Sequence, residues 1–276
     1  MTDDTARALA IAVAQFAPTA DRDENLSTIG ALARRAAERG ASLVVFPEYS
    51  SRFTPEPGPL WLEHAESLDG PFVTALSSLA DEIGVHLVAG FVEKADGERV
   101  SNTLVAIAPE RGVVATYRKL HLYDAFGQKE SEWVLPGDID EPEMFDVDGL
   151  RIGLQTCYDV RFPEVTRRLV DAGADVVCIP AEWVRGPLKE HHWRTLVTAR
   201  ALENTIFVAA ADHTPPIGVG TSLIVDPMGV ELAALGEAED VALAWVSRER
   251  IDAVRRVNPA LALRRFAVVP RSTPLS

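Results

Sequence analysis

The sequence predicts an α/β fold, and three of its features carry that prediction. Ten short segments rich in Val, Ile, Leu and Ala are typical of strands. Between several of them, four longer segments repeat apolar residues at helical spacing. Some strand segments, such as 175–179, are apolar without alternation, which is typical of strands buried on both faces. Strands that alternate with helices, together with hairpin-like pairs, indicate a mixed sheet covered by helices.

The predicted strands are bounded by Gly, Pro and polar residues, which favour turns. In chain order they are expected over residues 9–15, 42–46, 85–92, 103–108, 113–118, 150–156, 175–179, 206–211, 222–225 and 241–246. The helices are expected over residues 25–39, 71–83, 163–171 and 190–203, and each begins or ends at, or next to, Pro, Gly or an acidic residue. The proline-rich segment 54–59 is expected to be a loop near the mouth of a pocket.

Length and charge narrow the class of protein. The 276 residues exceed the commonest domain size, yet no linker divides them, so a single domain over 1–276 is expected. The formal net charge of −14 opposes binding to nucleic acid. Residues 1–5 are acidic where a secretory signal is basic, and no apolar run approaches the roughly 18 residues of a membrane helix. Two cysteines form no disulfide framework, so a cytoplasmic location without membrane contact is expected.

A single thiol lies at a predicted strand-to-helix corner. Cys157 follows the strand 150–156, and Pro163 and Glu164 suit the first turn of a helix. Reactive groups of α/β proteins are commonly placed at such corners. Cys157 is therefore a candidate nucleophile, although a lone cysteine beside an apolar strand is more often a small buried hydrophobic residue. Cys178, within the apolar segment 175–179, is expected in the core.

Two charged residues also come directly after predicted strands. Glu48 follows Pro47 beyond the strand 42–46, so its carboxylate is expected in the next loop. Lys119 follows the strand 113–118. Only four of the 27 basic residues are lysines, at positions 94, 119, 129 and 189. A lysine where arginine is the rule indicates that a compact ammonium is needed, and the alternative is an ordinary surface lysine.

Four blocks of this sequence resemble the nitrilase superfamily, also called carbon-nitrogen hydrolases. They are Phe46-Pro47-Glu48, residues 117–124, Glu130-Ser131 with Pro136-Gly137, and residues 157–164. Their order and spacing match over nearly the whole chain, and weaker agreements follow at 180–183, 200–204 and 226–229. The resemblance implies a four-layer αββα sandwich with two sheets face to face. It also implies a homodimer in which the C-terminal tail, about 259–276, packs on the partner.

The resemblance assigns roles that the side-chain chemistry suits. Cys157 would attack an amide carbonyl to form a thioester, and Glu48 would take the thiol proton and pass it to the departing ammonia. Lys119 and the backbone N–H of Tyr158 would hold the oxyanion. An adjacent ammonium also favours thiolate over thiol. Glu130 matches the second glutamate of the amidase branch, which orients substrate; the alternative is that 128–132 is a solvated polar loop.

Neither a metal nor an organic cofactor is implied. Six histidines are scattered through the chain, and the adjacent pair His191-His192 would point apart on a helix, which makes a poor pair of metal ligands. His121 is expected to support the loop after Lys119, rather than to act as a base.

Substrate preference follows from the block 157–164, which looks like that of small-amide and ω-amidase members. True nitrilases typically have Trp-Glu after the cysteine, so an amide is favoured over a nitrile. Arg161 would bind a carboxylate at the far end of the substrate, or else it braces Glu164 or the start of the helix. Trp183 would wall the acyl pocket, or else it is a core residue.

The sequence is compatible with three functions. The favoured one is cysteine-dependent hydrolysis of a small aliphatic or ω-amide to the carboxylic acid and ammonia. An N-carbamoyl amine or amino-acid amidohydrolase would use the same glutamate, lysine and cysteine but would also release carbon dioxide. A non-catalytic binding protein on the same fold is disfavoured by the intact set Glu48, Lys119, Glu130 and Cys157.

Overall fold

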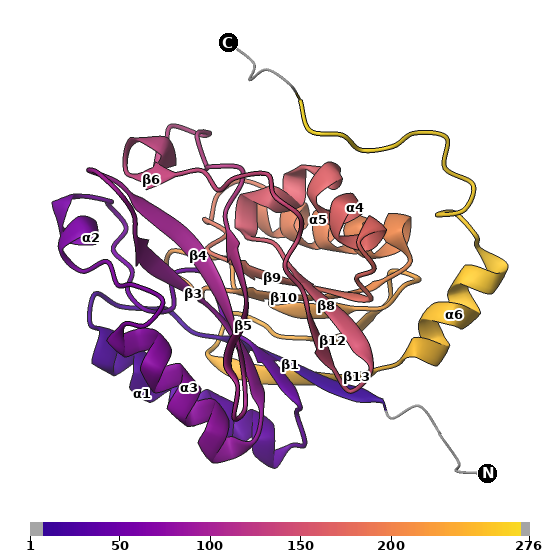
Figure 1. Ribbon diagram of the computed structural model, residues 1–276, viewed down its shortest axis with the longest axis horizontal. Helices are drawn as coiled ribbons and strands as arrows, with labels where there is room; N and C mark the ends of the chain where they lie inside the picture. Colours follow the sequence, from indigo (N-terminus) through magenta and orange to yellow (C-terminus); the bar gives the residue numbers. More distant parts are fainter. Residues whose placement is uncertain (1–7, 272–276) are drawn as a thin grey trace.

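The computed structural model describes residues 8–271, which form two β-sheets packed face to face with helices on both outer surfaces (Figure 1). The four-layer αββα sandwich expected from the resemblance is confirmed. All ten predicted strands and all four predicted helices are present, with ends that shift by up to three residues.

The first sheet has seven strands and mixed direction. In spatial order it comprises β13 (Asp240–Val246), β1 (Leu9–Gln15), β2 (Leu43–Val45), β3 (His86–Lys94), β4 (Val100–Ala108) and β5 (Gly112–Arg118), and the short β6 (Val134–Leu135) pairs with β4. β2 is parallel to both of its neighbours, whereas β4 is antiparallel to β3 and β5.

The second sheet has six strands. In spatial order it comprises β12 (Glu231–Ala234), β11 (Leu223–Val225), β10 (Phe207–Asp212), β9 (Val176–Ala181), β8 (Leu150–Leu154) and β7 (Phe145–Val147). β8, β9 and β10 are parallel. The parallel strands of both sheets are almost wholly buried, which explains why they read as continuous apolar runs.

Three apolar layers hold the sandwich together. Residues from the inner faces of both sheets, such as Val13, Val45 and Ile152, form the layer between them, and Cys178 lies there as predicted. Burial raises the pKa of the Cys178 thiol, so it stays neutral. The second layer joins the outer face of the first sheet to α1 (Arg22–Glu38) and α3 (Pro71–Ile83). The third joins the second sheet to α4 (Pro163–Asp171) and α5 (Lys189–Asn204).

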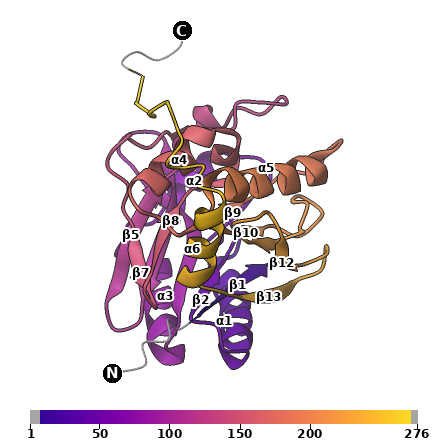
Figure 2. The same cartoon turned by 90° about the vertical axis from the view of Figure 1, so that its right-hand side faces the viewer.

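The differences from the predicted elements have local causes. The first helix begins at Arg22 rather than at residue 25 because the Asp21 carboxylate accepts hydrogen bonds from the N–H groups of Asp23 and Glu24. Two helices were not predicted, the five-residue α2 (Pro59–Glu63) and α6 (Arg248–Val257). α6 carries mostly charged residues and buries only Ile251 and Val254, so too few apolar residues mark it as a helix in the sequence. It lies across one end of the sandwich (Figure 2), where Ile251 joins the layer between the sheets.

The C-terminal tail is irregular after α6, in line with the absence of a helical pattern (Figure 1). Leu261 packs against the layer over the second sheet, and Arg264 forms an ion pair with Asp171 of α4. Three apolar side chains farther along are exposed, namely those of Leu263, Phe266 and Val269. The last five residues of the predicted tail, 272–276, lie outside the described residues.

Within residues 8–271, every helix is too short or too polar to cross a membrane.

Candidate active site

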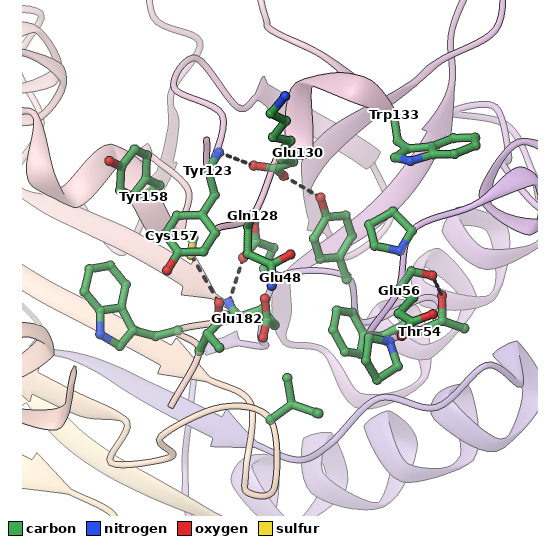
Figure 3. A pocket seen from close by; sticks show the side chains of 18 of the residues that line it. Glu48, Thr54, Glu56, Tyr123, Gln128, Glu130, Trp133, Cys157, Tyr158 and Glu182 are labelled. Carbon is green, nitrogen blue, oxygen red and sulfur yellow. Dashed lines mark hydrogen bonds between the residues drawn. The ribbon is translucent and has the colours of Figure 1, made fainter. Parts of the chain in front are cut away.

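A cavity of about 640 Å³ opens where loops of both sheets meet, and Figure 3 shows the residues that line it. The four residues predicted to be catalytic all line this cavity, although they come from separate parts of the chain. Tyr158 and Trp183 line it as well, and residues 54–57 lie at its rim, as the sequence predicted for this loop. The structure therefore brings together the candidate nucleophile, base, ammonium and second glutamate.

Cys157 lies on a sharp turn directly beyond β8. It begins the 3₁₀ helix η2 (Cys157–Arg161), and its φ of 44° is in the left-handed region that non-glycine residues rarely adopt. Asp159 fixes this turn, because its carboxylate accepts hydrogen bonds from the Tyr117 hydroxyl (2.7 Å) and from the His121 N–H (2.9 Å). The strained turn presents the thiol to the cavity. The N–H of Tyr158 belongs to the first turn of η2, where N–H groups have no partner inside the helix.

Glu48 is placed by a close crossing of two backbone segments. The chain leaves β2 and passes over β3 at Gly90, whose N–H donates to the Pro47 carbonyl at 3.1 Å. A Cβ atom at position 90 would lie 2.6 Å from the Tyr49 nitrogen and 2.7 Å from the Glu48 Cα. Only glycine permits this approach, which holds the Glu48 backbone close to the sheet.

The Glu48 carboxylate is fully buried and accepts three hydrogen bonds. Its Oε1 atom accepts from Asn102 Nδ2 at 2.6 Å and from Lys119 Nζ at 2.9 Å. Its Oε2 atom accepts from the backbone N–H of Glu182 at 2.7 Å. These three donors fix the position of the Glu48 carboxylate beside Lys119.

Lys119 is buried between two glutamates. Its Nζ atom lies 2.9 Å from Glu48 Oε1 and 2.8 Å from Glu130 Oε2. Burial alone would lower the pKa of Lys119, but Glu130 and Glu48 together raise it well above its ordinary value. The backbone of Lys119 is held on both sides, because its N–H donates to the Asn102 carbonyl and its carbonyl accepts from the Gly137 N–H. The side chain is therefore a fixed ammonium.

Glu130 is buried, so the solvated-loop alternative is wrong. Its carboxylate accepts hydrogen bonds from the Tyr49 hydroxyl at 2.6 Å and from the Tyr123 N–H at 2.6 Å (Figure 3). Burial raises its pKa, but Lys119 and these hydrogen bonds more than offset burial and lower it overall. Glu130 is thus an anion that orients Lys119.

The Cys157 thiol is neutral in the free protein. Burial is the largest cause that raises its pKa well above the ordinary value, and the Glu48 charge raises it further. Lys119 lowers the pKa, as the sequence suggested, but it does not offset the other two. Lys119 therefore favours the thiolate in the direction expected, and the thiol still needs a base to remove its proton. The thiol donates a hydrogen bond to the Glu182 carbonyl, with the sulfur 3.5 Å from the oxygen (Figure 3).

Three residues that contact Glu48, Glu130 or Cys157 were given no role by sequence reasoning. Asn102 donates to both catalytic-site glutamates, at 2.6 Å to Glu48 and 3.1 Å to Glu130. Tyr49 bonds Glu130, and Glu182 contacts Glu48 and Cys157 through its backbone. The Glu182 carboxyl has its pKa raised well above the ordinary value by burial and by the Glu48 charge. The available signals were a polar run, residues 101–103, within an apolar strand and an acidic residue at the end of another.

Of the three predicted substrate-binding residues, Tyr158 and Trp183 line the cavity and Arg161 does not. Trp183 is both a core residue, packed on Trp193 at 5.4 Å between ring centroids, and a wall of the cavity. The Tyr158 ring lines the cavity. Arg161 is not among the lining residues, and its guanidinium carbon lies 5.0 Å from the Trp183 ring centroid. Among the described residues Arg161 forms no ion pair with Glu164, so that part of the bracing alternative is not supported.

Lys189 lines the cavity beside this aromatic wall, although the sequence gave it no role. Its Nζ atom lies 3.1 Å from the Tyr123 hydroxyl and 4.7 Å from the Trp183 ring centroid. His121 supports the loop after Lys119, as predicted, through its Nδ1 atom, which is 2.7 Å from Asp159 Oδ1. Across residues 8–271, no three His, Cys, Asp or Glu side chains converge in a way that would hold a metal ion.

Comparison with known proteins agrees with this geometry. Residues 10–256 match the carbon-nitrogen hydrolase family. The chain is 39% identical over 257 residues to the deaminated glutathione amidase of Escherichia coli O157:H7, covering 93% of this chain and 97% of the relative. It is 29% identical to the omega-amidase NIT2 of Xenopus tropicalis, covering 92% of this chain and 94% of the relative.

A solved structure is similar over nearly all of this chain. The Caenorhabditis elegans NitFhit protein superposes with a TM-score of 0.84 at 30% identity, covering 94% of this chain and 65% of the NitFhit chain. The sequence match, the fold and the convergence of Glu48, Lys119 and Cys157 lead to one conclusion. The chain belongs to the carbon-nitrogen hydrolase family of the nitrilase superfamily.

Proposed function

We propose that this protein is a cysteine-dependent amidase that hydrolyses an amide whose acyl group ends in a carboxylate. The observation that carries the proposal is the convergence of Cys157, Glu48, Lys119 and Glu130 in one buried cavity. The residues supply a nucleophile, a base, an oxyanion donor and an anion that orients that donor.

Deprotonation of the thiol accompanies its attack on the substrate. Because the Cys157 pKa is raised, the resting sulfur carries its proton and needs a base. Glu48 is that base, and it passes the proton to the nitrogen that leaves. The carbon–nitrogen bond breaks, and the acyl group remains on sulfur as a thioester. Glu48 then takes a proton from water, whose oxygen attacks the thioester and returns the thiol.

Lys119 stabilises the oxyanion of each tetrahedral intermediate. An ammonium has three N–H donors. Two are directed to Glu48 and Glu130, at 2.9 and 2.8 Å, which leaves one for the substrate oxygen. The raised pKa of Lys119 keeps it charged throughout. The Tyr158 N–H is the second oxyanion donor in this proposal.

The substrate class follows from the cavity and from the relatives. Lys189 lines the cavity and Arg161 lies against the same Trp183 ring, and their positive charges suit a carboxylate at the far end of the acyl chain. A small ω-amide that releases ammonia fits the resemblance to omega-amidase. Deaminated glutathione is the second candidate, because the relative that acts on it by name is 39% identical. The cavity of about 640 Å³ has room for a leaving group larger than ammonia.

A product assay tests the proposal. The panel contains an ω-amide of a dicarboxylic acid, a neutral short amide, deaminated glutathione, a nitrile and a ureido acid, with the Cys157→Ala protein as control. We expect an amine or ammonia from the carboxylate-bearing amides, and none from the variant. Release of carbon dioxide and ammonia from the ureido acid alone would identify an N-carbamoyl hydrolase instead. If the folded protein releases no product from any compound of the panel, the proposal is refuted.

We also propose a homodimer in the cytoplasm. The exposed apolar side chains of Leu263, Phe266 and Val269 would be covered by a partner, and a working thiol requires a reducing compartment. Light scattering after size exclusion should give twice the mass of the chain. A protein truncated after Asn258 should give a smaller dimer fraction, and an unchanged fraction would remove the tail from the interface.

A further inference from the structure

Lys189 is a buried lysine that lacks a carboxylate partner. Only 5% of the residue is exposed, and its Nζ atom donates a hydrogen bond to the neutral Tyr123 hydroxyl. Within residues 8–271 it forms no ion pair, whereas the other buried lysine, Lys119, has two. A buried ammonium without an anion is costly, so its position needs an explanation other than the stability of the fold.

The position of Lys189 in its helix increases the free-energy cost of burying its charge. It is the first residue of α5, a helix of 16 residues, whose N-terminus carries the positive end of the helix dipole. Burial is the largest cause that lowers the pKa of Lys189, and the Arg161 charge also lowers it, against smaller opposite effects of Cys157, Glu182 and Asp212. An anion bound beside Lys189 would relieve both the helix dipole and the repulsion from Arg161.

Arg161 shares the aromatic surroundings of Lys189. Its guanidinium carbon is 5.0 Å from the Trp183 ring centroid and 5.9 Å from that of Phe126, and Lys189 Nζ is 4.7 and 4.9 Å from the same centroids. The Nε and Nη2 atoms of Arg161 are buried and have no hydrogen-bond partner in the described chain. Two cations therefore share one aromatic cluster, and neither forms an ion pair with a carboxylate of residues 8–271.

The lining residues separate the roles of the two cations. Lys189 and Tyr123 line the cavity, whereas Arg161 lies against the aromatic wall and is not a lining residue. Of the two cations, only Lys189 is therefore placed to contact a molecule in the cavity. Arg161 can act on such a molecule through its charge, from its place against the Trp183 ring.

We propose that Lys189 determines specificity by binding the substrate carboxylate directly, with Arg161 as its electrostatic support, and by repelling substrates that carry an ammonium at that end. The inference rests on the proposed amidase function, and it assigns the contact to Lys189 rather than to Arg161. It names the substrate class as amides of dicarboxylic acids without an amino group next to the distal carboxylate.

Matched substrates and variants test this assignment. Glutaramate and pentanamide have the same chain length and differ in a carboxylate against a methyl group, and glutamine adds an amino group to glutaramate. The Lys189→Met protein keeps the aliphatic stem and loses the charge. Lys94→Met makes the same change on an exposed lysine at the end of β3, outside the cavity.

We expect kcat/KM of Lys189→Met for glutaramate to fall about 10- to 100-fold, mostly through KM, because a hydrogen bond to a charged group is lost. The value for pentanamide should stay within threefold. Glutamine should be at least about tenfold poorer than glutaramate for the wild type, and the variant should narrow that gap. Arg161→Met should show a smaller loss than Lys189→Met, and Lys94→Met should show none.

A binding arm separates failure of this inference from failure of the proposed function. Calorimetry measures glutarate, the hydrolysis product, on the Cys157→Ala protein with and without Lys189→Met. If Lys189→Met lowers kcat/KM equally for glutaramate and pentanamide, the inference is overturned, while the proposed amidase function is retained. If the wild type cleaves none of the amides in the product-assay panel, the proposed function fails, and glutarate binding that weakens at least tenfold in the Lys189 variant still supports the inference. Binding that is absent or unchanged overturns it. Lys189→Gln replaces Lys189→Met if the latter does not fold.

Discussion

The substitution Glu48→Gln should change two properties of the site in opposite directions. Glutamine cannot accept a proton, so general-base catalysis is lost, and amidase activity should fall about 10²- to 10⁴-fold. The same change removes the charge that raises the Cys157 pKa, while Lys119, which lowers it, remains. The thiol should therefore become more acidic and more reactive toward an alkylating reagent, even as turnover is lost.

The structural cost of Glu48→Gln can be worked from its contacts. The Glu48 carboxylate accepts from Asn102, Lys119 and the Glu182 N–H, at 2.6, 2.9 and 2.7 Å. If the glutamine oxygen takes the place of Oε1, its NH₂ group faces the Glu182 N–H and one hydrogen bond is lost. The expected destabilisation is about 1–3 kcal/mol, and the pocket should remain folded.

The assay combines ammonia release with iodoacetamide labelling from pH 7 to 10, followed by intact-mass spectrometry. In the wild type, the labelling rate should still be rising above the ordinary thiol pKa of about 8.5. In Glu48→Gln the rise should move to lower pH, with faster labelling at pH 8. Slower labelling of a folded variant, or amidase activity within tenfold of the wild type, would refute the role of Glu48.

Three other substitutions have expected outcomes. Gly90→Ala should lower kcat at least about tenfold, because its Cβ would lie 2.6 Å from the Tyr49 nitrogen and displace Glu48. Unchanged kinetics would show that the close backbone approach at Gly90 does not position Glu48. Asn102→Ala should lower kcat/KM about 10- to 100-fold and reduce Tm, because two hydrogen bonds to carboxylates are lost; an effect on Tm alone would limit Asn102 to folding. Glu182→Gln should raise Tm at pH 7 but not at pH 4. Each kcal/mol gained in the free energy of unfolding should raise Tm by about 2–4 °C. The Glu182 pKa is raised on folding, so wild-type stability falls as pH rises above the unfolded value, whereas glutamine does not titrate; a Tm difference independent of pH would contradict this.

The fold and the main catalytic candidates were open to prediction because they follow local rules. Strands such as β1 are apolar runs with clear ends, and Cys157, Glu48 and Lys119 each lie just beyond such a run. The carboxyl ends of strands are where α/β proteins place reactive groups. The match to a known family then fixed the two-sheet arrangement, which apolar periodicity does not distinguish from other α/β folds.

The missed residues depend on contacts between segments that are far apart in the chain. Asn102 lies inside β4, and its role arises only because β4 brings it under both Glu48 and Glu130. Lys189 begins α5, where a lysine in sequence looks like an ordinary helix-surface residue, and only its burial and its missing partner distinguish it. The net pKa of the Cys157 thiol was likewise not open to prediction, because it depends on burial, whose effect exceeds that of the adjacent ammonium.

Detection of the acyl-enzyme tests the central claim most directly. The wild type is mixed with excess glutaramate, quenched in acid during turnover, and measured by intact-mass and peptide mass spectrometry. The account predicts an added glutaryl group on the peptide that contains Cys157, and neither the adduct nor ammonia release with Cys157→Ala. Ammonia release by Cys157→Ala at a rate near that of the wild type, with no adduct on either protein, would contradict it.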